Sequence, residues 1–129
     1  MMVYQKSTAL ANTIYGLVEK WIHFHQNTLG TQIVKSADSI AANISEGFGR
    51  YHYAEKKSFY YYARGSLLET KTHITLAKNR ALINKELAEQ ILLQADDILR
   101  MLNALIKSTG KMKEPPNPKT LNPSPKPNP

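Results

Sequence analysis

The helical spacing of apolar residues is the feature of this chain that most restricts its fold. In four segments apolar side chains recur every three or four residues, which places them on one face of an α-helix. No segment shows the sustained alternation that is typical of a half-buried β-strand. The chain is therefore expected to be all-α.

The first two segments predict one long helix over residues 3–28 and a second helix after it. Asn27 and Thr28 offer a stop and a new N-cap between the two. The first helix carries apolar heptad rows that include Val3, Leu10, Ile14, Leu17, Trp21 and Phe24. The apolar face of the second helix consists of Ile33, Ala37, Ile40 and Ile44.

The third and fourth segments predict two further helices, from about Tyr53 to Ala81 and from Asn84 to about Gly110. Asn84 is a favourable N-cap with Glu86 in the first turn, and Gly110 is a natural C′ residue. Short polar breaks separate all four helices, and short connections favour antiparallel neighbours. The predicted fold is an antiparallel, up-and-down four-helix bundle over residues 1–110.

Composition divides the chain at the end of the bundle. All seven prolines lie between Pro115 and Pro129, so residues 111–129 are expected to form a disordered, basic, proline-rich tail. The formal net charge of the whole chain is +7, which favours polyanionic partners. Without a cysteine, a leader or a membrane span in the sequence, we expect a cytoplasmic protein with no membrane contact.

The glycines in the stretch NISEGFGR, Asn43 to Arg50, suggest three alternatives: a phosphate-binding loop, an RNA-recognition motif or the end of a helix. Its spacing does not fit a phosphate-binding loop, and a helix rather than a strand precedes it, unlike in an RNA-recognition motif. The interpretation that remains is structural. Gly47 would end the second helix in a left-handed conformation, Phe48 would fold back as an apolar plug, and Gly49 would permit the chain reversal.

Three stretches resemble a known family: SADSIAANISEGFGR (36–50), YYARGSLLET (61–70) and MLNALIKS (101–108). They are similar to the bacterial four-helix-bundle proteins described as 23S rRNA intervening sequence proteins. The resemblance implies a homo-oligomer, a pentamer in family members, and association with RNA or DNA. Distant relatives are the accessory variability determinant proteins of diversity-generating retroelements, which bind a reverse transcriptase. No catalytic residues are implied.

Basic residues recur every seven positions along the third helix, at Lys57, Arg64, Lys71 and Lys78. This spacing places them in one slowly drifting stripe that spans about 30 Å. Such a stripe fits a phosphate backbone, but it is equally typical of an ordinary solvated helix face. The candidate nucleic-acid-binding residues are those four together with Arg50, Lys56 and Arg80.

Tyr61 and Leu68 are expected to share the outer side of the third helix with the basic stripe. An exposed pair of this kind indicates a subunit contact more often than a base-stacking site. Both residues are therefore candidates for an oligomer interface.

The sequence favours neither catalysis nor a metal site. No histidine pair has the helical spacing of metal ligands, no nucleophile context is present, and no cofactor is expected. The leading hypothesis is a non-enzymatic nucleic-acid-binding protein. The alternative is an oligomeric scaffold for a protein partner such as a reverse transcriptase.

Overall fold

A computed structural model describes residues 1–111, which form four long helices and contain no strand. The long helices are α1 (Met2–Val18), α3 (Thr31–Phe48), α4 (Tyr53–Asn79) and α5 (Lys85–Lys111). Between α1 and α3 lie the short α2 (His23–His25) and a π-helical turn, η1 (Gln26–Gly30). The predicted all-α class is confirmed for these residues. The sequence predicts the tail over residues 111–129; Lys111 is instead the last residue of α5, and residues 112–129 lie outside the described part.

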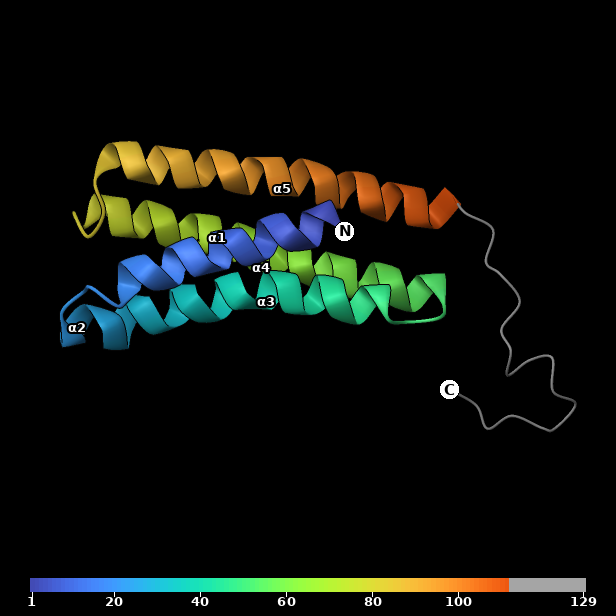
Figure 1. Ribbon diagram of the computed structural model, residues 1–129, viewed down its shortest axis with the longest axis horizontal. Helices are drawn as coiled ribbons and strands as arrows, with labels where there is room; N and C mark the ends of the chain where they lie inside the picture. Colours follow the sequence, from blue (N-terminus) through green and yellow to red (C-terminus); the bar gives the residue numbers. More distant parts are fainter. Residues whose placement is uncertain (112–129) are drawn as a thin grey trace, which may run out of the picture.

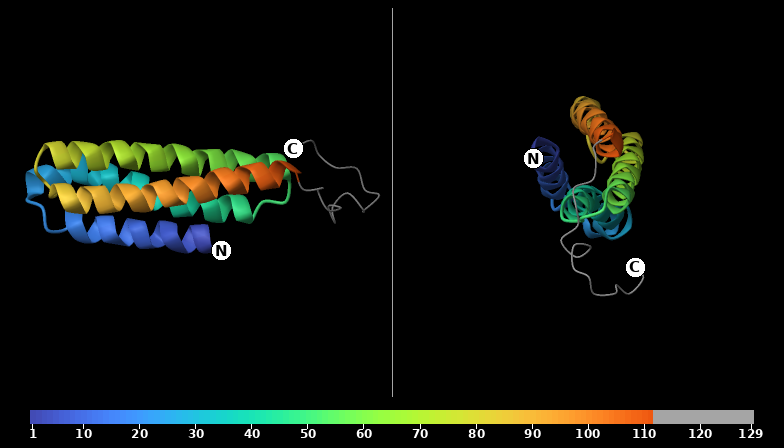
Figure 2. Two further views of the ribbon diagram at one scale, coloured as in Figure 1. Left: turned by 90° about the horizontal axis from the view of Figure 1, so that it is seen from above. Right: turned by 90° about the vertical axis from the view of Figure 1, so that its right-hand side faces the viewer.

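The four long helices lie side by side around a common apolar core. Figure 1 shows the α1–α3 and α4–α5 connections at one end and the α3–α4 connection at the other. Helix α3 packs against α1 and α4, and α5 packs against α4 and α1, so the end-on view in Figure 2 shows a ring of four neighbours. Each helix thus has two partners for its apolar face.

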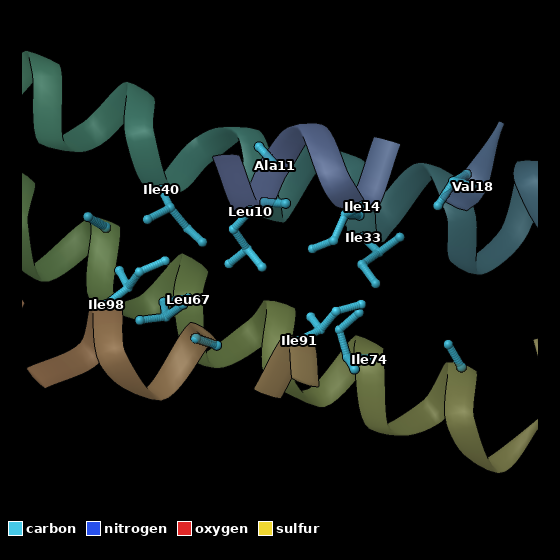
Figure 3. Close-up of a cluster of buried hydrophobic side chains, with 14 of the residues drawn as sticks. Leu10, Ala11, Ile14, Val18, Ile33, Ile40, Leu67, Ile74, Ile91 and Ile98 are labelled. Atoms are coloured by element: carbon cyan, nitrogen blue, oxygen red, sulfur yellow. The ribbon is translucent and has the colours of Figure 1, made fainter. Parts of the chain in front are cut away.

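All four long helices contribute large buried side chains to this core, as the close-up in Figure 3 shows. Burying a Leu or Ile side chain contributes roughly 1.5–3 kcal/mol, so the core supplies the main drive for folding. Core residues drawn in Figure 3 include Leu10, Ile14, Ile33, Ile40, Leu67, Ile74, Ile91 and Ile98.

The single helix predicted over residues 3–28 is wrong. Helix α1 ends at Val18, and the chain turns through an extended Ile22 before a new helical run begins at His23. The side chain of Gln26 donates to the carbonyl oxygens of Val18 (3.2 Å) and Glu19 (3.0 Å) at the end of α1. The Val18 carbonyl also accepts from the Trp21 backbone N–H at 3.0 Å. Phe24, placed in the apolar row by sequence, is 68% exposed.

The predicted break at Asn27 and Thr28 is also absent, because the π-turn carries the helical run into α3. In this π-turn the backbone N–H of Thr31 donates to the Gln26 carbonyl oxygen, which closes a wider ring than in an α-helix. The Thr31 hydroxyl donates to the same oxygen at 2.9 Å. Gly30 is buried in this turn, and a Cβ there would lie 2.8 Å from Val18 Cγ1. The glycine therefore lets the end of α1 approach the start of α3.

Helices α1 and α5 are joined at the surface by charged side chains. Lys6 of α1 donates to the carboxylate of Asp97, which also accepts from Arg100. The hydrogen bond from Lys6 lowers the pKa of Asp97 below its usual value, and the positive charges of Lys6 and Arg100 add to the effect. Within residues 1–111, no helix has the length and apolar character needed to cross a membrane.

Candidate nucleic-acid interface

The four basic residues at seven-residue spacing form a row along one side of α4: Lys57, Arg64, Lys71 and Lys78. We call them the basic row, and its first three members contact α5. Arg64 donates from Nη1 to Asn103 Oδ1 at 2.8 Å, and Lys71 Nζ lies 2.5 Å from Asp96 Oδ1. Lys57 Nζ would lie 2.7 Å from a Cβ built on Gly110. From Lys57 to Lys71 the row therefore follows the seam between α4 and α5.

The contacts of the basic row leave different amounts of charge for a partner. Lys71 is paired with a carboxylate, so part of its charge is compensated. Arg64 is held by the neutral amide of Asn103, and its guanidinium carbon lies 4.9 Å from the ring centroid of Tyr61. These contacts orient the guanidinium without cancelling its charge.

The other three candidate cations lie toward the two ends of α4. Arg50 and Lys56 are at the α3–α4 end, whereas Arg80 is the exposed C-cap residue at the opposite end. A helix of 27 residues is about 40 Å long, so Arg80 is far from the first two. The structure brings Arg50, Lys56 and Lys57 to one end of the bundle and Lys78 and Arg80 to the other.

At the α3–α4 end both cations are held against aromatic rings. Lys56 donates from Nζ to the Phe48 carbonyl oxygen at 2.9 Å and lies 5.5 Å from the centroid of the Phe48 ring. The guanidinium carbon of Arg50 lies 4.7 Å from the Phe59 ring centroid, and Nη2 is 4.0 Å from Glu46 Oε1. A backbone carbonyl carries no net charge, so Lys56 keeps its own.

The conformational roles predicted for Gly47 and Phe48 are wrong. No described glycine has a positive φ: Gly47 is helical and buried, and the helix ends at Gly49 with φ −79°. Phe48 is 64% exposed rather than folded back as a plug. Gly47 is instead a packing glycine, because a Cβ at this position would lie 2.7 Å from Tyr60 Cε1.

A cavity of about 410 Å³ opens beside this turn, and we call it the end pocket. Its walls come from Phe48, Tyr51, Tyr53 and Tyr60, and Arg50 and Lys56 line it as well. The sequence did not predict this pocket, because part of its lining comes from the far end of the described chain. Those residues of α5 are Leu105, Ser108 and Thr109.

The two candidate interface residues are exposed, Tyr61 at 45% and Leu68 at 48%. Tyr61 contacts Arg64 of the basic row, so the apolar and basic surfaces adjoin. Leu93 on α5 is also exposed and was not singled out by sequence. Leu93 was not part of the sequence patterns that identified the other candidate interface residues.

Histidine and acidic residues do not gather into a metal site in the described part of the chain. Among residues 1–111, no group of three or more His, Cys, Asp or Glu side chains has an arrangement that could hold a metal ion. His73 is buried, with Nδ1 3.4 Å from Ser36 Oγ, and thus belongs to the packing between α3 and α4.

Comparison with known proteins finds similarity along most of the bundle. The family model described as 23S rRNA-intervening sequence protein matches residues 1–104. A crystal structure of a protein of unknown function from the S23 ribosomal protein family of Bacteroides thetaiotaomicron VPI-5482 superposes with a TM-score of 0.74 at 27% sequence identity. The similarity covers 81% of this chain and 98% of that one. No protein with a curated description matches.

Proposed function

Because the chain belongs to the 23S rRNA-intervening sequence protein family, we propose that it is a non-enzymatic protein that binds nucleic-acid phosphates through the basic side of α4. The bundle in this proposal is antiparallel and up-and-down. RNA is the preferred partner, and DNA would be bound by the same phosphate chemistry.

The observation that carries the proposal is the mode in which Arg64 is held. A neutral amide and an aromatic ring fix its guanidinium at the middle of the basic row, where an additional phosphate contact would be charge-assisted. Between Gly47 and Arg80 the sequence has seven Lys and Arg residues and two Glu residues, a balance of +5. A field of this sign attracts a polyanion and raises its rate of association.

A salt titration tests the proposal. We expect affinity for a structured RNA to fall steeply with salt, because each phosphate contact contributes about 0.7–0.9 to the slope of log K against log salt concentration. Fluorescence anisotropy with an internally labelled RNA measures this slope. Affinity that stays unchanged between low and high salt would refute phosphate binding by α4.

We also propose that the chain acts as a homo-oligomer, and the pentamer implied by the family resemblance is the expected state. The support is the exposed pair Tyr61 and Leu68 beside the basic row. Repetition of the row around a ring would strengthen the field and add avidity for a long polyanion.

Charge in the apolar pair is expected to dissociate the oligomer. Tyr61→Glu with Leu68→Glu places two carboxylates in a contact that would have to desolvate them, so the mass measured by light scattering should fall. Tyr15→Glu with Phe24→Glu is the control, because both residues are exposed but lie outside α4. A mass that is unchanged in the α4 variant, or lowered only in the control, would place the subunit contact elsewhere.

A second candidate is an oligomeric scaffold whose main partner is a protein, such as a reverse transcriptase. The observation that favours it is the pairing of Lys71 with Asp96, which uses part of the basic row within the bundle. Nucleic acid would then be bound only when the partner adds its own contacts. Measurable RNA affinity of the isolated chain distinguishes the first candidate from the second.

A further inference from the structure

The end pocket lies where three distant parts of the chain meet. Figure 1 shows the α3–α4 connection and the C-terminal end of α5 at the same end of the bundle, and the N-terminus of α1 points toward that end but stops short of it. The pocket is lined from each of these parts, with Met1, Phe48 and Leu105 as examples. A site assembled from three elements is held in shape by the packing of the bundle rather than by a loop alone.

Packing around Tyr60 fixes the inner wall of the pocket. Tyr60 is 2% exposed, and burial raises the pKa of its hydroxyl. Its ring is so close to the backbone of Gly47 that a Cβ there would lie 2.7 Å from Cε1. The ring is therefore packed tightly against α3, and this wall is already formed without a ligand.

The pocket combines aromatic surface with positive charge. Phe48, Tyr51 and Tyr53 add rings beside Tyr60, while Lys56 and Arg50 line the same cavity. Lys56 is anchored to the Phe48 carbonyl oxygen at 2.9 Å, which keeps its ammonium group at the pocket. A ligand that matches this lining needs a flat unsaturated ring and an anionic group a short distance from it.

An unpaired nucleotide has both features, and the volume suits it. Cavities that bind small ligands span roughly 300–1,000 Å³, and the end pocket measures about 410 Å³. Proteins that recognise single-stranded RNA stack its bases on aromatic side chains and hold the adjacent phosphates with basic ones. A paired base presents no free face inside a duplex, so the pocket would select unpaired positions.

The basic row leads directly to the pocket. Lys57, its first member, lies beside Gly110, and the neighbouring Thr109 lines the cavity. A nucleic acid that follows the row along α4 would therefore arrive at the pocket at the α3–α4 end. The two surfaces together suit a duplex that continues into a single strand.

From this geometry we infer that the end pocket binds an unpaired nucleotide of an RNA strand, with its base against the aromatic walls and its phosphate at Lys56 and Arg50. The inference rests on the proposed function, because it assigns the kind of RNA that the basic row would hold. Phosphate binding by the basic row alone would tolerate any sequence. The pocket would add a preference for RNA in which a duplex ends or joins a single strand.

The test compares two RNA probes that share one internally labelled duplex of about 16 base pairs. One probe has blunt ends, and the other carries an unpaired 3′ extension of about four nucleotides. Wild type should bind the extended probe about five-fold more tightly or better, because base stacking on an aromatic ring has this order of effect. Phe48→Ala and Lys56→Gln should each remove most of the preference while affinity for the blunt duplex changes less.

Phe24→Ala is the matched control, because Phe24 is as exposed as Phe48 but lies in α2, at the other end of the bundle. It should retain the full preference. Equal affinity for both probes, or a preference that survives Phe48→Ala and Lys56→Gln, would overturn the inference and leave phosphate binding intact. Binding of the extended probe alone would support the pocket and count against the basic row. Binding of neither probe would overturn both the inference and the proposed phosphate binding.

Discussion

Replacement of Lys57, Arg64, Lys71 and Lys78 by glutamine is expected to lower affinity for structured RNA by at least ten-fold at low salt. Each contact that is lost should also reduce the salt slope by up to about one unit. Arg64→Gln alone should account for the largest share, since its charge is held by a neutral acceptor. Lys71→Gln should account for the smallest, because Lys71 must exchange Asp96 for phosphate.

A second variant distinguishes the effect of where the positive charges lie from the effect of the net charge of the protein. Lys20, Lys35, Lys85 and Arg100 are exposed and lie outside α4. Their replacement by glutamine also reduces the formal net charge from +7 to +3. Anisotropy titrations should show near-normal affinity for this control, and equal losses in the two variants would mean that net charge alone attracts the RNA.

The oligomer mass must accompany those titrations because Tyr61 contacts Arg64. A variant that loses subunits would lose avidity even if its phosphate contacts were secondary. Light scattering at the concentrations used for binding decides between the two causes. An intact mass with a reduced salt slope assigns the loss to the basic row.

The positions of the long helices could be predicted because local periodicity sets which residues share a face. The prediction of an N-cap at Asn84 is confirmed: its Oδ1 accepts from the Leu87 backbone N–H at 2.8 Å. The end of α1 could not be predicted, because the apolar row continues through Trp21 and Phe24. The break depends instead on Gln26 and Gly30, whose partners belong to a preceding helix.

Two glycine predictions fail, and the packing around the two residues differs. Gly47 and Gly110 were interpreted as helix ends, yet both lie within helices, and neither has a positive φ. At Gly47 the buried ring of Tyr60 lies 2.7 Å from the ideal Cβ position, so the glycine is needed for packing. At Gly110 the neighbour at 2.7 Å is the flexible end of Lys57, which can move aside. A glycine in the sequence can mark either a turn that needs conformational freedom or a close contact between helices. Only the tertiary packing distinguishes these two roles.

The candidate site could likewise be predicted only in part. The seven-residue spacing placed four cations on one side of α4, as the structure has them, because that follows from helix geometry. Their partners Asn103 and Asp96 could not be inferred, since the register of α4 against α5 is set by the core. The end pocket lay beyond sequence reasoning for this reason too.

Gly47→Ala is expected to destabilise the bundle, although alanine is the better helix former. The new Cβ would lie 2.7 Å from Tyr60 Cε1 and 3.0 Å from Phe59 Cβ. Neither neighbour can yield easily, because the Tyr60 ring is buried and Phe59 Cβ is fixed to the backbone of α4. Overpacking of this kind typically costs about 1–3 kcal/mol, which exceeds the helix gain of about 1 kcal/mol over most of that range.

Gly65→Ala supplies the control with the same chemistry. Gly65 is exposed in the middle of α4, and nothing lies within 4 Å of a Cβ at that position. This variant should gain up to about 1 kcal/mol. Both variants gain helix propensity, more at the interior Gly65 than at Gly47 near the end of α3. The packing penalty at Gly47 is expected to dominate the difference between their unfolding free energies.

Thermal melts at one fixed protomer concentration measure this difference, since oligomerisation makes the midpoint depend on concentration. For a domain of this size, about 1 kcal/mol shifts Tm by roughly 4–8 °C, so the two midpoints should differ by on the order of 10 °C. Equal shifts would show that α3 and α4 are not in contact at Gly47. Tyr60→Leu should relieve the clash, because leucine has no atom that reaches as far as Cε1, so Gly47→Ala should cost less in that background. Such a rescue would tie the close approach of α3 and α4 to the ring that also forms the inner wall of the end pocket.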